Sequence, residues 1–133
     1  MIVYKKRRHY RYTLFADYQH QTSLGIVLPV EIPPVIALAI NGLLTVRKGY
    51  AWDGPSGPTI DTPNFMRGSL VHDVLYQLMR EELIPQEHRE YADKLLREIC
   101  LEDGMSQIRA WVVYQGVRLG GASGAAPDLL RAP

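Results

Sequence analysis

The sequence contains a single cysteine, Cys100, so no disulfide can form within the chain and the cysteine content does not point to an oxidising compartment. It also lacks any run of about 18 uncharged apolar residues, the length that a transmembrane helix needs. No apolar segment follows the early basic residues Lys5 to Arg8, so a secretory signal peptide is not expected. These absences predict a protein made in the cytoplasm of the producing cell, with no transmembrane segment.

The composition is that of an ordinary globular protein. Of the 133 residues, 47% are hydrophobic and 22% are charged, and a chain of this length is large enough to bury one hydrophobic core. The sequence therefore predicts a single domain over residues 1–120. Residues 121–133, rich in Gly, Ala and Ser, are expected to form a flexible tail.

Charge is distributed unevenly along the chain. Residues 1–50 hold seven Lys and Arg against two Asp and Glu, whereas residues 51–133 hold eight against twelve. A basic arm at residues 1–11 is a candidate for binding a polar partner, although a solvated strand start with tyrosines packed beneath it explains the same pattern. The acidic second half makes nucleic acid an unlikely partner. The candidate partner-binding residues of the arm are Lys5, Lys6, Arg7, Arg8 and Arg11.

The first half of the chain reads as strands. A long strand is predicted over residues 10–18 and a weaker one over residues 22–27. The most specific hairpin signal is Asn41-Gly42 between two apolar runs, residues 35–40 and 43–46, because these residues tolerate the positive φ angles of a tight turn. The front half is therefore expected to be a small antiparallel sheet.

The second half has helical periodicity. Pro63, preceded by Thr62, can start a first helix, and Pro85 fits the first turn of a second helix that ends near Gly104. Ser106 can cap a third helix that is apolar on nearly all sides, so Trp111 is a candidate partner-binding residue. Strands followed by helices predict an α+β fold, with a small N-terminal antiparallel sheet followed by a C-terminal three-helix layer.

Candidate catalytic residues gather around a loop at residues 50–63 and the helix after it. His72 can act as a general base, and Asp93 on the next helix can hold its imidazole in one tautomer if the two helices pack as an antiparallel pair. Asp73 and Asp53 are candidate metal ligands for a hard cation such as calcium. Three further residues of the candidate site are Ser56, an alternative nucleophile; Asp61, an oxygen donor; and Tyr76, on the same helix face as His72.

A purely structural role explains the same residues. A histidine bonded to an aspartate on a neighbouring helix can simply tie two helices together, and an aspartate after a strand often caps a turn. A catalytic site and a structural cluster therefore remain alternatives at the level of sequence.

Two resemblances bear on this choice. Residues 43–120 resemble the small phage and bacterial proteins grouped as domain of unknown function 1353, through the Gly49-Tyr50 strand end, the Asp53 loop, His72-Asp73-x-x-Tyr76, Ala92-Asp93 and an apolar last helix ending in Gly120. This resemblance implies a phage or prophage origin. The helices also resemble the active-site helices of secreted phospholipases of the A-two class, which implies His72 as base, Asp73 as calcium ligand and Asp93 as the residue that orients His72.

Together these observations predict a phage-type protein that uses a His/Asp site to hydrolyse an ester or amide bond, on host lipid or envelope and with calcium. The alternative is a non-catalytic virion or assembly component, or a host-factor binder, that contacts phage structural proteins or the host envelope through its basic arm and its third helix. Its location would then be the host cytoplasm on synthesis and the virion afterwards.

Overall fold

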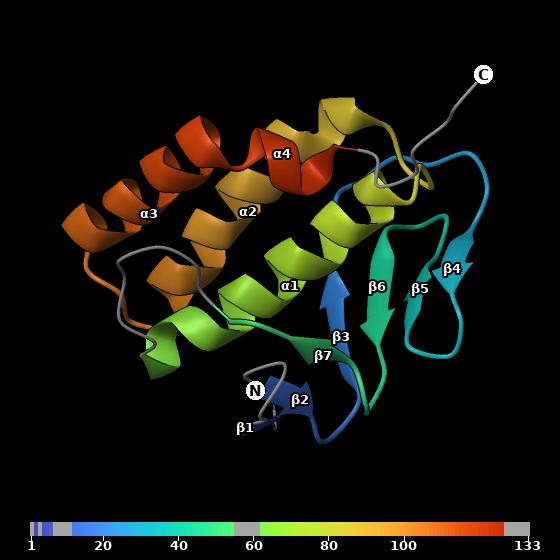
Figure 1. Cartoon of the computed structure of the whole chain (residues 1–133), viewed down its shortest axis with the longest axis horizontal. Helices are drawn as coiled ribbons and strands as arrows, with labels where there is room; N and C mark the ends of the chain where they lie inside the picture. Colours follow the sequence, from blue (N-terminus) through green and yellow to red (C-terminus); the bar gives the residue numbers. More distant parts are fainter. Residues whose placement is uncertain (1, 3, 7–11, 55–61, 127–133) are drawn as a thin grey trace. The chain divides into compact units, whose positions relative to one another are not determined.

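The computed structural model describes residues 2, 4–6, 12–54 and 62–126 (Figure 1). Strands occupy the first part of the described chain and helices the second, so the predicted α+β fold is confirmed. The chain divides into two compact units, residues 1–62 and residues 63–133. The expectation of one domain over residues 1–120 stays a prediction.

The strands of the first unit form two antiparallel sheets instead of the single small sheet predicted. One sheet has the strand order β1-β2-β7 and the other has the order β3-β6-β5-β4. The strands are β1 (Tyr4–Lys6), β2 (Tyr12–Leu14), β3 (Tyr18–Gln21), β4 (Val30–Ile32), β5 (Ile36–Leu38), β6 (Leu43–Val46) and β7 (Ala51–Trp52).

The Asn41-Gly42 hairpin is present as predicted. It joins β5 to β6, with Ile36 opposite Val46 and Leu38 opposite Leu44. Gly42 has a φ of +89°, a conformation that glycine adopts without steric strain. Because side chains alternate along a strand, these four apolar residues point to one face, and all of them are buried.

The two other strand predictions need correction. The strand expected over residues 10–18 is broken, because β2 ends at Leu14 and β3 begins at Tyr18 in the other sheet. Between them, Asp17 Oδ1 accepts a hydrogen bond from the Lys48 backbone N–H at 2.7 Å, which holds the connection. Residues 22–27 form no strand, since the Thr22 side chain donates to Gly42 O at 2.6 Å and accepts from Leu24 N at 3.2 Å.

The second unit is helical, and its boundaries follow the sequence signals closely. Its helices are α1 (Pro63–Arg80), the 3₁₀ turn η1 (Gln86–His88), α2 (Arg89–Glu102), α3 (Gln107–Gly120) and α4 (Ala122–Ala125). The Ser106 side chain caps α3 by accepting from Arg109 N at 3.2 Å, as predicted. Gly104, directly after the last residue of α2 and its cap Asp103, has a φ of +96°.

Helices α1 and α2 approach each other closely at Gly68. A Cβ atom at this position would lie 3.0 Å from both Cys100 Sγ and Leu96 Cδ1 and 3.3 Å from Leu96 O, so a larger residue would require these groups to shift. A buried cluster extends this contact to α3 and comprises Phe65, Leu96, Cys100, Met105, Ala110 and Val113. This packing fixes which faces of α1 and α2 meet.

Residues 122–125, expected within a flexible tail, form the short helix α4. Gly124 O accepts a hydrogen bond from Arg80 Nη1 at 2.9 Å, and Ala125 O accepts one from the Gln86 side chain, so both groups fasten α4 to the second unit. Within the described residues, every helix is too short or too polar to cross a bilayer.

Candidate functional site

Helices α1 and α2 bring His72, Tyr76 and Asp93 together. His72 and Tyr76 are four residues apart, so they lie on the same face of α1, and their ring centroids are 4.1 Å apart. Asp93 lies on the opposing face of α2, where Ala92, Leu95 and Leu96 are also buried. The predicted convergence of His72 with Asp93 is present in the structure.

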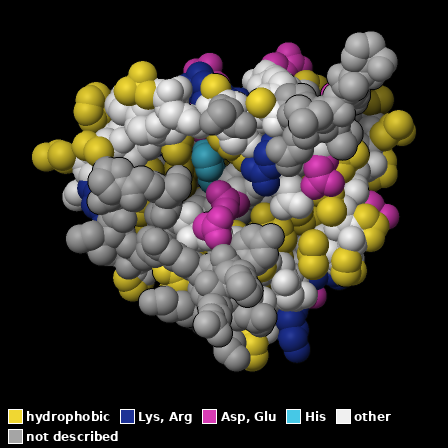
Figure 2. Space-filling model, viewed as in Figure 1, with side chains coloured by type: hydrophobic (Ala, Val, Ile, Leu, Met, Phe, Trp, Pro, Cys, Tyr) yellow, Lys and Arg dark blue, Asp and Glu magenta, His cyan; other side chains and the backbone are white. Residues whose placement is uncertain are grey.

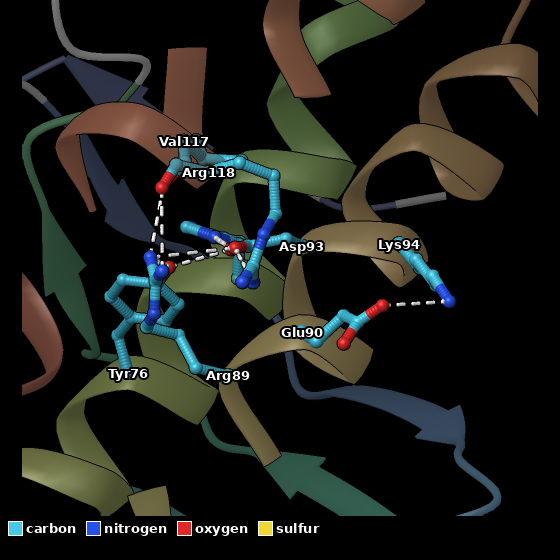
Figure 3. Close-up of polar contacts among 8 residues, drawn as sticks. Tyr76, Arg89, Glu90, Asp93, Lys94, Val117 and Arg118 are labelled. Carbon is cyan, nitrogen blue, oxygen red and sulfur yellow. Dashed lines mark hydrogen bonds and ion pairs between the residues drawn. The ribbon is translucent and has the colours of Figure 1, made fainter. Parts of the chain in front are cut away.

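The Asp93 carboxylate, which is completely buried, is the centre of the cluster. Its Oδ1 lies 2.7 Å from His72 Nε2 and accepts a hydrogen bond from Tyr76 Oη at 2.6 Å. Its Oδ2 accepts a hydrogen bond from Arg118 Nη1, on the last turn of α3, at 2.8 Å. Figure 3 shows the side chains of Tyr76, Asp93 and Arg118 meeting between α1, α2 and α3. One carboxylate therefore connects three helices.

Arg89 adds a second cation to the cluster. Its Nη1 lies 3.7 Å from Asp93 Oδ2 and 3.4 Å from Tyr76 Oη. The same guanidinium donates to two backbone carbonyls at the end of α3, Val117 O at 3.1 Å and Arg118 O at 3.3 Å. Val117 O also accepts from the Gly121 backbone N–H at 2.8 Å, so Arg89 adds a further donor at the C-terminal end of α3, where carbonyls lose their helical partners.

The electrostatic environment keeps Asp93 ionised. Burial alone would raise the pKa of Asp93, but the hydrogen bonds from His72 and Tyr76 and the contact with Arg118 bring it below its ordinary value. Burial and the bond to the Asp93 carboxylate raise the pKa of Tyr76, so the phenol stays protonated and donates. The exposed Glu90–Lys94 pair at 3.0 Å lies outside this cluster (Figure 3).

The ionised carboxylate determines the tautomer of His72. Because a carboxylate can only accept, the neutral imidazole must carry its proton on Nε2, which leaves a lone pair on Nδ1. No described residue makes a hydrogen bond to Nδ1. The His72 side chain keeps 9% of its surface exposed.

The remaining predicted site residues lie in different parts of the chain. Asp73 follows His72 on α1 and is half-buried with interactions of its own. Asp53 is exposed after β7, in the other unit, and Ser56 and Asp61 lie outside the described residues. In the described part of the chain, no three His, Cys, Asp or Glu side chains are placed to hold a metal ion.

The candidate partner-binding residues lie in two separate places. Lys5 and Lys6 belong to β1, whereas Arg7, Arg8 and Arg11 are outside the described residues. Trp111 lies on α3 with 52% of its surface exposed. On the face shown in Figure 2, a histidine side chain is visible beside acidic side chains, and hydrophobic side chains project at the margin where α3 lies.

Comparison with known proteins places the chain in a family. The model of a family described as Protein of unknown function (DUF1353) matches residues 33–117, a range that contains α1, α2, the hairpin and most of α3. The chain belongs to this DUF1353 family. No curated protein and no solved structure matches it. The matched range of this DUF1353 protein includes His72, Tyr76, Arg89 and Asp93 and stops one residue before Arg118.

Sequence reasoning missed the two arginines of the cluster. Arg89 could have been found, because it precedes Asp93 by four residues on one helix and so lies on the same face. Arg118 has no such signal. It lies 25 residues from Asp93, and only the packing of α3 against α2 brings its guanidinium to the carboxylate.

Proposed function

We propose that this protein hydrolyses an ester or amide bond by activating water, with His72 as the general base and Asp93 as the residue that positions it. The observation that carries the proposal is the state of the imidazole. Its Nε2 lies 2.7 Å from a buried, ionised carboxylate, so in the neutral ring the lone pair is on Nδ1, where no described residue makes a hydrogen bond. A base needs one nitrogen held and the other available.

The chemistry follows from this geometry. A water molecule at Nδ1 gives its proton to His72 as its oxygen adds to the carbonyl carbon of the substrate. The buried Asp93 carboxylate stabilises the resulting imidazolium, because opposite charges attract more strongly where water is excluded. When the bond to the leaving oxygen or nitrogen breaks, His72 returns the proton to that atom. Tyr76, Arg118 and Arg89 act only by holding Asp93.

A calcium ion would need ligands from two parts of the chain. Asp73 provides one carboxylate beside His72, but the other expected ligands belong to the loop at residues 53–61, most of which lies outside the described residues. The described residues do not by themselves form a metal site. A calcium requirement is tested by assays with added calcium and with a chelator.

The substrate class that we propose is host lipid or another ester of the host envelope, in keeping with a phage-type protein. The test measures product release from p-nitrophenyl esters and from phosphatidylglycerol vesicles. Replacing His72 with Gln should lower turnover at least about 100-fold, since positioned general bases typically contribute that much. Gln keeps a donor for Asp93, so helix content by circular dichroism should be unchanged.

A matched control is His88→Gln, which replaces another imidazole, half-buried at the end of η1 and absent from the hydrogen bonds to Asp93. This variant should turn over substrate at the wild-type rate. Equal activity of wild type and His72→Gln would rule out the mechanism. Background rates for the wild-type protein on every substrate, with and without calcium, would rule it out as well.

A non-catalytic role is the second candidate function, and the exposed apolar side chains of α3 favour it. In that role the protein would be a virion or assembly component, or a host-factor binder, and the His72–Asp93 bond would serve only to join α1 and α2. Stoichiometric amounts in purified phage particles, measured by mass spectrometry, would support this candidate.

A further inference from the structure

Four large apolar side chains of α3 are exposed to solvent. The exposed fractions are 79% for Ile108, 52% for Trp111, 50% for Val112 and 87% for Leu119. With 3.6 residues per turn, these positions fall within an arc of about 100° around the helix, so they share one side, here named the α3 face. Ala110 and Val113 point the other way and are buried in the core.

The α3 face is apolar without being needed for folding. The helix already packs on α2 through its opposite side, and the cap at Ser106 fixes its start. Burying four such side chains against a partner would be favourable, whereas leaving them in water has no structural benefit. An exposed group of this kind indicates a binding surface.

Charge distinguishes the classes of partner. No Asp or Glu occurs between residues 104 and 127, although the whole chain has 14 of them. The charged residues of α3 are Arg109 and Arg118, and the Arg118 side chain remains 29% exposed. An apolar face with an exposed tryptophan and no acidic neighbours along its own segment can approach a negatively charged surface without repulsion.

The size of the face argues against a second copy of the chain. Four partly exposed side chains offer on the order of 500 Å². A stable protein dimer buries about 800 Å² on each partner. A bilayer has no such minimum, because each apolar side chain that enters the region below the headgroups adds to binding on its own.

We infer that the α3 face binds the surface of an anionic phospholipid bilayer, with α3 lying in the plane of the headgroups. Arg118 on this helix is bonded to Asp93, so a docked protein would hold the His72 cluster within about one helix diameter of the bilayer. The substrate would then be an ester of the bilayer itself. That last step rests on the proposed hydrolysis, whereas the binding does not.

The two tryptophans make the binding measurable. Trp111 is 52% exposed, while Trp52 is 2% exposed and should not respond. With vesicles of phosphatidylcholine and phosphatidylglycerol, the emission of Trp111 should shift to shorter wavelength, and lipids brominated on their acyl chains should quench it. Trp111→Phe should remove both changes, and vesicles of phosphatidylcholine alone should bind less protein.

A double variant tests the face directly. Ile108→Ser with Leu119→Ser should lower the vesicle-bound fraction in sedimentation at least about ten-fold, because two apolar side chains no longer enter the bilayer. The matched control is Val27→Ser with Leu28→Ser, which changes two apolar residues with 90% and 72% exposure in the other unit. The control should bind like the wild type.

Three results would overturn the inference. These are no binding to the anionic vesicles, equal binding by the α3 double variant, or a wild-type dimer in sedimentation equilibrium that the double variant splits. The last result would assign the face to a second copy. His72→Gln should bind vesicles normally, so binding without turnover would refute the proposed function alone, and turnover of vesicle lipid without binding would refute only the docking.

Discussion

Replacing Asp93 with asparagine should destabilise the helical unit by about 3–5 kcal/mol, the usual result of breaking a buried ion pair from one side. The substitution keeps the size of the side chain but removes its charge and turns one acceptor oxygen into a donor NH₂ group. Either that NH₂ faces Arg118, which is itself a donor, or it faces His72 and Tyr76. In both orientations the three donors that meet Asp93 cannot all be satisfied.

The magnitude follows from the contacts. A hydrogen bond to a charged group contributes about 1.5–3 kcal/mol, and the short bonds from His72, Tyr76 and Arg118 all end on this carboxylate. The loss in the free energy of unfolding should stay below three times the value for one such bond, because the Arg118 side chain is 29% exposed and can turn toward water. Arg89 keeps its bonds to the two carbonyls of α3.

Urea unfolding, followed by circular dichroism at a helix wavelength, measures the effect. A loss of this size should lower the urea midpoint by roughly 2 M. The control is Glu90→Gln, which removes a carboxylate from the same helix but only an exposed pair with Lys94, so its midpoint should hardly change. If Asp93→Asn unfolds at the same urea concentration as Glu90→Gln, the cluster does not hold the helices together.

The pH dependence of unfolding tests the same prediction in a second way. The pKa of Asp93 is lower in the folded state than its ordinary value of 3.8, so its contribution is complete above that value and is lost as the pH falls through the folded pKa. The difference between wild type and Asp93→Asn should therefore shrink below about pH 4. A difference that stays constant down to pH 2 would contradict the assignment of the effect to this carboxylate.

Two further predictions concern the core and the exposed side of α3. Gly68→Val should destabilise the protein by about 1–3 kcal/mol, because the valine side chain would collide with Leu96 and Cys100. Gly116→Ala has open space around it and should stabilise α3 by about 0.5–1 kcal/mol. Thermal unfolding should therefore show a lower melting temperature for the first variant and a higher one for the second. Burial raises the pKa of Cys100 to about 12, so Ellman's reagent at pH 8 should label this thiol only when the core opens. Labelling within seconds in native buffer would show that the thiol is not enclosed.

Much of the helical unit could be predicted from local signals. The start of α1 at Pro63, the Ser106 cap of α3 and the turn at Gly104 depend on the conformations that single residues allow, and such preferences act within a few positions. The hairpin at Asn41-Gly42 belongs to the same class. The pairing of His72 with Asp93 was also within reach, because two helices joined by a short connection pack antiparallel.

The strands were harder to predict because their hydrogen bonds come from distant segments. Nothing between residues 12 and 21 shows that the chain leaves one sheet at Leu14 and joins another at Tyr18, a change that depends on pairing with β7 and β6. Threonine has a high strand propensity, yet the Thr22 hydroxyl donates to Gly42 O, and the segment that follows does not join the hydrogen-bond ladder of a sheet.

By itself, the sequence determined the order of strands and helices, the ends of the helices, and the presence of one imidazole and one carboxylate on facing helices. Only the tertiary structure decided that the packing of α3 places Arg118 beside Asp93, that the Asp93 carboxylate is completely buried, and that one side of α3 stays exposed. The physical reason is range. Backbone sterics and capping act between neighbours in the chain, whereas burial and charge pairing depend on groups that folding brings together from distant positions.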